Sequence, residues 1–161
     1  MPSFWEKIQV AGKDMDLYAS VPSGAGPFPA VVVAHPASGV GEFTRSITDR
    51  LAEAGFAAVA PDRFHRITKE MLADGSAAGQ FSRDPEVIAD YDATVDFLRS
   101  HPVIDSERIG VMGFCSGGRV TWLVAATNPH YKAAEPYNLS LKHNCRCRRI
   151  QRCRSRWSPY H

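Results

Sequence analysis

The stretch that most constrains the fold of this chain is GFCSGG, at residues 113–118. It lies between an apolar, strand-like run at 109–112 and an apolar, helix-like run at 120–126. A side chain that projects from a sharp turn between a strand and a helix needs very small neighbours two positions away on either side, and Gly113 and Gly117 meet that need. The spacing Gly-x-nucleophile-x-Gly therefore predicts a nucleophile elbow.

The register of this stretch favours Cys115 rather than Ser116 as the nucleophile. If Ser116 stood at the tip of the turn, the bulky Phe114 would occupy a flanking position and crowd it. The helix that starts after Cys115 directs backbone N–H groups at the thiol, which favours the thiolate form, and Gly118 lets this helix pack close to the sheet. The alternative is a glycine-rich turn around a buried, unreactive cysteine.

The rest of the chain predicts an α/β fold in which a mostly parallel sheet carries flanking helices. The apolar, β-branched run at 28–34 suits a strand that is buried on both faces of such a sheet. The order strand, helix, strand over 28–60 is a βαβ unit, which implies parallel pairing. The expected elements are strands at 4–10, 15–21 and 28–34, a helix at 43–54, a strand at 56–60, a helix from 84, a strand at 108–113, a helix at 120–126 and the start of a strand at 132–134.

Two of these helices show a regular apolar spacing. In the first, which Gly55 is expected to end, the recurring apolar residues are Phe43, Ile47, Leu51 and Ala54. In the helix from 84, the expected buried stripe consists of Val87, Tyr91, Val95 and Leu98. Between the two helices, the segment 63–83 has no clean period apart from a short helical stretch at 69–73. This segment is either a region of substrate contacts or a lid, or a plain surface connection.

The chain resembles the dienelactone hydrolase family of the α/β-hydrolases. The resemblance rests on GFCSGG at 113–118, on AGFAAVAPD at 54–62, and on the small-residue loop that follows Val33 and Ala34. It covers roughly residues 10–137. It implies an α/β-hydrolase-like fold that is incomplete at the C-terminus.

The resemblance also implies a role for each matching residue. Cys115 would attack the carbonyl carbon of a small-molecule ester or lactone, in the manner of a carboxymethylenebutenolidase, and form a thiol ester that water resolves. The backbone N–H groups of Ala37 and Ser116 would form the oxyanion hole. This chemistry needs neither a metal nor an organic cofactor.

Two departures from the family pattern affect the expected activity. Family members often place a glutamate just after the third strand, next to the nucleophile, whereas this chain has Pro36 there; the adjacent His35 remains a candidate pocket residue. In this fold an acid and then a histidine follow the nucleophile, each after a further strand. After Cys115 the acidic and histidine residues are Glu135, His130, His143 and His161. We therefore expect the triad Asp and His to be missing and the hydrolase activity to be impaired.

The segment 138–161 differs chemically from the rest of the chain. It holds 7 of the 19 Lys and Arg residues and none of the 17 Asp and Glu residues, whereas residues 1–137 hold 12 Lys and Arg together with all 17 acids. It shows neither helical nor strand periodicity. The expected organisation is a partial hydrolase-like domain at 1–137 and a disordered, basic, Arg- and Cys-rich tail at 138–161.

Three interpretations of this tail remain open. One is a nucleic-acid-binding arm with Trp157 and Tyr160 as stacking residues, which would make the chain a non-catalytic, hydrolase-like protein. Another is a metal site, although Cys-x-Cys with one further cysteine is not a usual zinc pattern; its ligands would be His143, Cys145, Cys147 and Cys153. The third is a shifted reading frame or a truncated gene end, which the abrupt change in composition favours.

The chain contains no sign of a membrane segment. No run of 18 or more apolar residues occurs, so we expect no transmembrane helix. The start, MPSFWE, lacks the basic-then-apolar order of a signal peptide. The expectation is a cytoplasmic protein with no membrane partner, and the sequence leaves its oligomeric state open.

Overall fold

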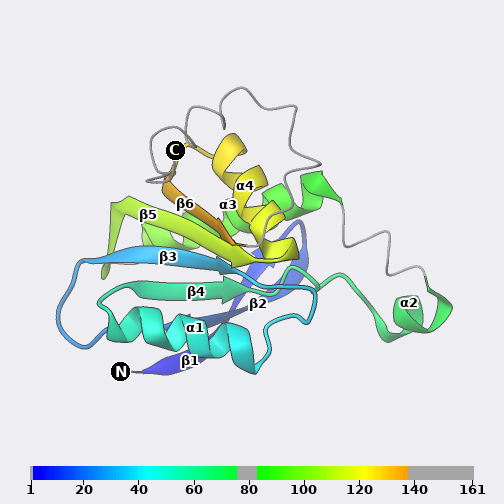
Figure 1. Cartoon of the computed structure of the whole chain (residues 1–161), viewed down its shortest axis with the longest axis horizontal. Helices are drawn as coiled ribbons and strands as arrows, with labels where there is room; N and C mark the ends of the chain where they lie inside the picture. Colours follow the sequence, from blue (N-terminus) through cyan, green and yellow to red (C-terminus); the bar gives the residue numbers. More distant parts are fainter. Residues whose placement is uncertain (1, 76–82, 138–161) are drawn as a thin grey trace.

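The computed structural model describes residues 2–75 and 83–137, and these residues form one mixed sheet with helices on both faces (Figure 1). The expected α/β-hydrolase-like architecture is confirmed. The tail at 138–161 lies outside the described residues. The elements are β1 Ser3–Val10, β2 Lys13–Ser20, β3 Phe28–Ala34, α1 Glu42–Glu53, β4 Ala57–Pro61, α2 Lys69–Asp74, α3 Asp84–Ser100, β5 Ile104–Phe114, α4 Ser116–Thr127 and β6 Tyr131–Tyr137.

The order of the strands places the ends of β3 and β5 side by side. Across the sheet the order is β1-β2-β4-β3-β5-β6, with β1, β2 and β4 paired antiparallel and β4, β3, β5 and β6 paired parallel. The chain leaves β3 for β4 on one side and later returns to β5 on the other side. Such a reversal is a topological switch point, and ligands of open α/β sheets bind at the carboxyl ends of the strands there.

The main core lies between the sheet and helices α3 and α4. The stripe expected on α3 is confirmed, since Val87, Tyr91, Val95 and Leu98 are all buried. These side chains pack against Val32 of β3 and its neighbours in one continuous cluster. Each large apolar side chain that is fully buried in this way stabilises the fold by about 1.5–3 kcal/mol.

Helix α1 covers the opposite face of the sheet. Its fully buried residues are not the apolar residues that recur at helical spacing at positions 43, 47, 51 and 54. Its buried residues are Thr44, Thr48 and Ala52, whereas the side chain of Phe43 is 51% exposed. The Thr44 hydroxyl donates to the Gly39 carbonyl (3.2 Å) and the Thr48 hydroxyl donates to the Thr44 carbonyl (2.8 Å). Because these local bonds satisfy the hydroxyls, α1 can pack its small face against the sheet.

One strand boundary differs from the sequence prediction because long-range pairing decides it. Strand β5 begins at Ile104 rather than at residue 108, since Ile104 pairs with Phe28 of β3. Helix α4 begins at Ser116, directly after the elbow, which confirms the expected helix start after Cys115. Helix α2 confirms the short helical stretch expected after β4 and projects from the body of the molecule (Figure 1). None of the described helices is long and apolar enough to span a membrane.

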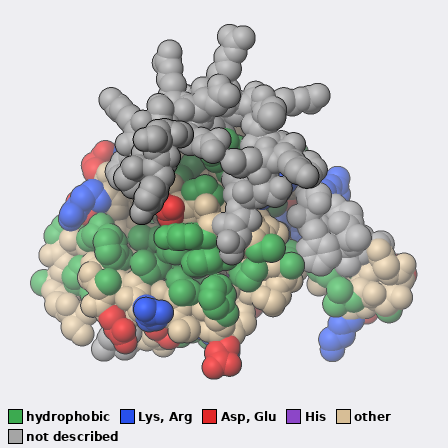
Figure 2. Space-filling model, viewed as in Figure 1, with side chains coloured by type: hydrophobic (Ala, Val, Ile, Leu, Met, Phe, Trp, Pro, Cys, Tyr) green, Lys and Arg blue, Asp and Glu red, His purple; other side chains and the backbone are tan. Residues whose placement is uncertain are grey.

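An aromatic row lies on the face that carries α1, and the rings at its two ends are exposed. The ring of Phe114, at the end of β5, stacks on Tyr137 with 4.8 Å between centroids and meets Phe43 edge-on at 5.2 Å. Phe43 and Tyr137 are 51% and 41% exposed. Figure 2 shows hydrophobic side chains gathered across this face of the molecule. Exposed apolar surface of this kind promotes association.

We predict that the chain self-associates through the row formed by Phe43, Phe114 and Tyr137. Phe43→Ser should weaken the association at least tenfold, because burial of one aromatic side chain contributes about 1.5–3 kcal/mol. Sedimentation velocity over a concentration series measures this. Phe56→Ser is the matched control, because Phe56 is an exposed aromatic residue (38%) that lies at the other end of α1. A wild-type chain that stays monomeric at all concentrations would contradict the prediction.

Candidate active site

Cys115 occupies the turn between β5 and α4 in a strained backbone conformation. Strand β5 ends at Phe114 and α4 begins at Ser116, so one residue makes the whole connection. Cys115 has φ 55° and ψ −119°, a region that residues with a Cβ rarely adopt and that costs about 1–3 kcal/mol. Its backbone N–H donates to the Tyr137 carbonyl (3.1 Å), and the residue is exposed. The turn thus holds the thiol out toward solvent.

The glycines expected at the elbow lie where a side chain does not fit. A Cβ on Gly113 would collide with the carbonyl of Gly117, and a Cβ on Gly117 would collide with the carbonyl of Ala34. A Cβ on Gly118 would approach the Tyr137 carbonyl to 2.7 Å, below any normal contact distance. The first turn of α4 therefore packs directly on the ends of β3, β5 and β6.

The two amides expected to form the oxyanion hole lie on neighbouring segments. Ser116 is the first residue of α4, and Ala37 lies in the loop that follows β3. These segments are adjacent because Ala34, the last residue of β3, pairs with Gly113 of β5. Among the described residues, neither the Ala37 nor the Ser116 N–H donates to a backbone or side-chain acceptor. The positive end of the α4 dipole points to the same place.

His35 is not the open pocket residue that the sequence suggested, because the structure buries it completely. Its side chain is 0% exposed and packs edge-on against Phe64. Nδ1 donates to the Pro36 carbonyl (2.7 Å), and Nε2 accepts from the backbone N–H of Arg63 (3.2 Å). Burial, together with the charge of Arg63, lowers the pKa of His35 to about 4. The ring is therefore neutral, and both of its nitrogens are engaged, so it is not free to serve as a base.

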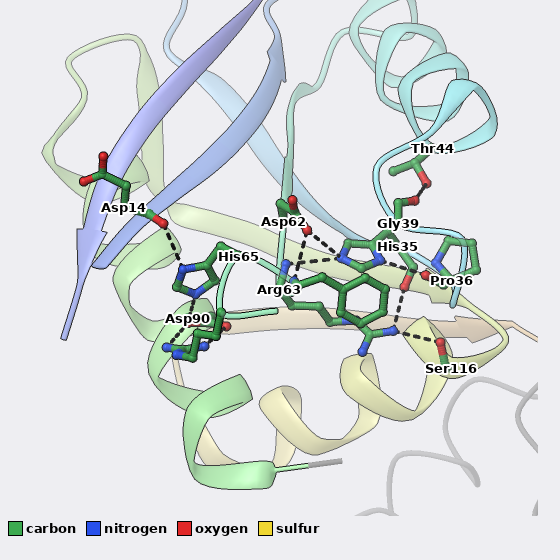
Figure 3. A network of polar contacts seen from close by, with 12 residues as sticks. Asp14, His35, Pro36, Gly39, Thr44, Asp62, Arg63, His65, Asp90 and Ser116 are labelled. Carbon is green, nitrogen blue, oxygen red and sulfur yellow. Dashed lines mark hydrogen bonds and ion pairs between the residues drawn. The ribbon is translucent and has the colours of Figure 1, made fainter. Parts of the chain in front are cut away.

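Arg63 is a site residue that sequence analysis missed. It follows β4 and is buried, with 7% of its surface exposed. Its Nη2 donates to the Ser116 hydroxyl (2.8 Å) and to the His35 carbonyl (3.2 Å), as Figure 3 shows. The sequence could have pointed to Arg63 because it closely follows a predicted parallel strand. Charged residues at the carboxyl end of such a strand lie where α/β folds bind ligands.

A second polar cluster anchors the same loop to α3. Asp90 of α3 is fully buried and accepts from Arg66 through both guanidinium Nη atoms (2.8 and 2.6 Å). His65 bridges Asp90 (3.1 Å) and the Asp14 carbonyl (2.9 Å) (Figure 3). The start of the segment 63–83 is thus a fixed polar connection, while residues 76–82 lie outside the described residues.

Among residues 2–75 and 83–137, no acid or histidine forms a hydrogen bond with the thiol of Cys115. His130 lies before β6, and Glu135 lies on β6 with its side chain exposed. The other two histidines considered, His143 and His161, lie outside the described residues, as do the cysteines of the tail. Among residues 2–75 and 83–137, no group of three or more His, Cys, Asp or Glu side chains is arranged to hold a metal ion.

Comparisons with known proteins identify the family to which the chain is similar. Residues 15–145 match the model of the dienelactone hydrolase family. A curated relative from Methylorubrum extorquens, named "Putative carboxymethylenebutenolidase", is 35% identical over 133 residues, which are 79% of this chain and 45% of that protein. A relative of the same name from Escherichia coli is 37% identical over 135 residues, which are 79% of this chain and 49% of that protein.

A solved structure gives the same result. The crystal structure from Klebsiella pneumoniae named "Putative Dienelactone Hydrolase" matches with a TM-score of 0.72 and 33% identity. The match covers 86% of this chain and 61% of that one. The chain spans about half the length of the curated relatives that it matches.

We predict that burial of His35 makes the fold acid-sensitive. The unfolded chain takes up a proton near pH 6.5, whereas folded His35 stays neutral down to about pH 4. The unfolded state therefore binds more protons in this window, and the free energy of unfolding falls by roughly 3 kcal/mol as the pH falls from 6.5 to 4. Urea denaturation at several pH values measures the fall.

His35→Gln is the informative variant, because Gln can accept from the Arg63 N–H but does not titrate. Its free energy of unfolding should change less between pH 6.5 and 4 than that of the wild type. His101→Gln, at an exposed histidine, should follow the wild type. Equal pH dependence in the His35→Gln variant and the wild type would show that His35 does not cause the acid sensitivity.

Proposed function

Because this chain belongs to the dienelactone hydrolase family, we propose that it acts on the ester or lactone bonds of small molecules through Cys115. The observation that carries the proposal is the backbone of Cys115, held at φ 55° between β5 and α4 with its side chain exposed. Backbone strain of this kind persists only where the surrounding structure holds it, and it clusters at active sites and ligand-binding sites. The strain is consistent with presentation of a nucleophile.

The proposed reaction begins with attack of the Cys115 thiolate on the carbonyl carbon. The carbon–oxygen π pair moves onto the oxygen, and the N–H groups of Ala37 and Ser116 donate hydrogen bonds to it. Collapse of this intermediate breaks the bond to the alcohol oxygen, which takes a proton from water and leaves a thiol ester on Cys115. Water then attacks the thiol ester and releases the acid. Every step uses protein groups and water, so the proposal includes no metal or organic cofactor.

Proton transfer is the weak part of this proposed mechanism. No described histidine or carboxylate forms a hydrogen bond with the thiol, and Pro36 stands where family members often carry a glutamate. Among the described residues, none is placed to take the thiol proton or to assist water as a general base in the second step. A positioned general base contributes about 10²- to 10⁴-fold to such steps. We propose an enzyme that is acylated slowly by activated esters and turns over more slowly still.

The alternative function, a non-catalytic protein with a nucleic-acid-binding tail, depends on residues 138–161. These residues lie outside the described part of the chain, and no observation within that part favours this alternative.

The proposal predicts a burst of one equivalent of p-nitrophenolate when the protein meets p-nitrophenyl acetate. The burst should be followed by steady turnover at least about 100-fold slower, because deacylation lacks a base. Stopped-flow absorbance measures both phases, and mass spectrometry locates the acetyl group. Cys145, Cys147 and Cys153 should first be replaced by Ser, because any of these thiols can react with the ester.

In that background, Cys115→Ala should abolish the burst, whereas Ser116→Ala should retain an amplitude of one equivalent, because the acyl group resides on Cys115. A full burst from the Cys115→Ala variant would rule out the proposed nucleophile. Loss of the burst amplitude in Ser116→Ala alone would point to Ser116 instead.

A further inference from the structure

Arg63 carries a buried positive charge that no carboxylate neutralises directly. Its side chain is almost fully buried, and burial lowers the pKa of its guanidinium. Asp90 is already occupied by Arg66 and His65, and Asp62 accepts from the backbone N–H of Phe64 (3.0 Å). A buried charge without a direct partner is expensive. Its position therefore calls for a reason other than stability.

The contacts of Arg63 all lie at the switch point between β3 and β5. Its Nη2 bonds to the Ser116 hydroxyl and to the His35 carbonyl, and its guanidinium lies over the ring of Phe64, 4.5 Å from the centroid. Its backbone N–H bonds to the His35 ring. Its Nε has no hydrogen-bond partner among the described residues. One side chain thus joins the loop after β3 to the first residue of α4.

The side chain of His35 extends this link to the second amide of the oxyanion hole. The Pro36 carbonyl and the Ala37 N–H belong to one planar peptide group, in which they point in opposite directions. The His35 Nδ1–H and the Gly39 N–H both donate to that carbonyl (2.7 and 3.1 Å). These bonds fix the plane of the peptide group and therefore the direction of the Ala37 N–H.

We propose that Arg63 is a positioning residue that holds the two halves of the oxyanion hole in register, with His35 as its intermediary to Ala37. The inference rests on the proposed function of Cys115. The planar guanidinium suits this task, because its donors have fixed directions and its charge does not titrate in the pH range of the reaction. It acts through Ser116 and His35 and does not touch the reacting atoms.

The test compares two reactions of the same thiol, in the background that lacks the three tail cysteines. Attack on p-nitrophenyl acetate creates an oxyanion, whereas alkylation by iodoacetamide occurs at a saturated carbon and creates none. Arg63→Met should lower the rate constant for acylation by roughly 10- to 100-fold relative to that for alkylation. Arg108→Met, which removes an exposed arginine from β5, is the matched control and should leave the ratio of the two rate constants unchanged.

A double-mutant cycle tests the route through Ser116. Ser116→Ala removes the hydroxyl and keeps the backbone N–H, so it should lower the same ratio by a smaller factor. If Arg63 acts through that hydroxyl, the double variant should be little slower than Arg63→Met alone. Ser116→Ala also keeps the inference testable if Arg63→Met does not fold, which circular dichroism would reveal.

Three outcomes would overturn the inference. Equal slowing of acylation and alkylation would show that Arg63 acts on the thiolate and not on the oxyanion hole. An unchanged ratio in both Arg63→Met and Ser116→Ala would show that neither group positions the amides. Additive effects in the double variant would remove the route through Ser116. A burst that survives Cys115→Ala would instead contradict the proposed function itself, so the two failures are distinguishable.

Discussion

The functional end of this molecule depends on one close backbone contact, between the first turn of α4 and the carbonyl of Ala34 at the end of β3. Gly117 lies so near that carbonyl that no side chain fits between them. Helix α4 must therefore begin immediately after β5, and the single connecting residue, Cys115, takes a positive φ. The bond from its N–H to Tyr137 and the buried apolar face of α4 hold this conformation in place. The strain at Cys115, the proposed nucleophile, is thus maintained by the packing of the helix on the sheet.

The groups around this contact favour negative charge. Backbone N–H groups, the positive end of α4 and the guanidinium of Arg63 all favour negative charge, and no carboxylate of the described residues forms a hydrogen bond with the thiol. Where related enzymes often carry a glutamate, Pro36 instead offers its carbonyl to the buried ring of His35. The arrangement favours an oxyanion, and the described residues give little help with proton transfer. The site therefore supports the proposed attack of Cys115 on a carbonyl carbon better than it supports hydrolysis of the resulting thiol ester.

The same region has an apolar side. Phe114 directly precedes Cys115 and stacks on Tyr137, and Phe43 of α1 completes an exposed aromatic row. The surface that presents the thiol to solvent is therefore also a surface that favours apolar contact. Any partner or acyl group that covers the row will lie close to the elbow. Phe114 is thus the residue through which the aromatic row borders the elbow.

The sequence alone determined the order of the elements, the buried stripe on α3 and the position of the elbow. Each of these depends on the spacing of glycine or apolar residues within a short segment of the chain. Glycines at 113 and 117 and the apolar run at 28–34 carry that information within a few residues. Only the tertiary structure decided that α1 buries Thr44 rather than Phe43, and that His35 is enclosed and neutral. It also decided that Arg63 joins the loop after β3 to the first residue of α4, two segments that are far apart in the chain. These features depend on which strands become neighbours, and the pairing of β3 with β5 links residues about 80 positions apart, a separation that no local pattern records.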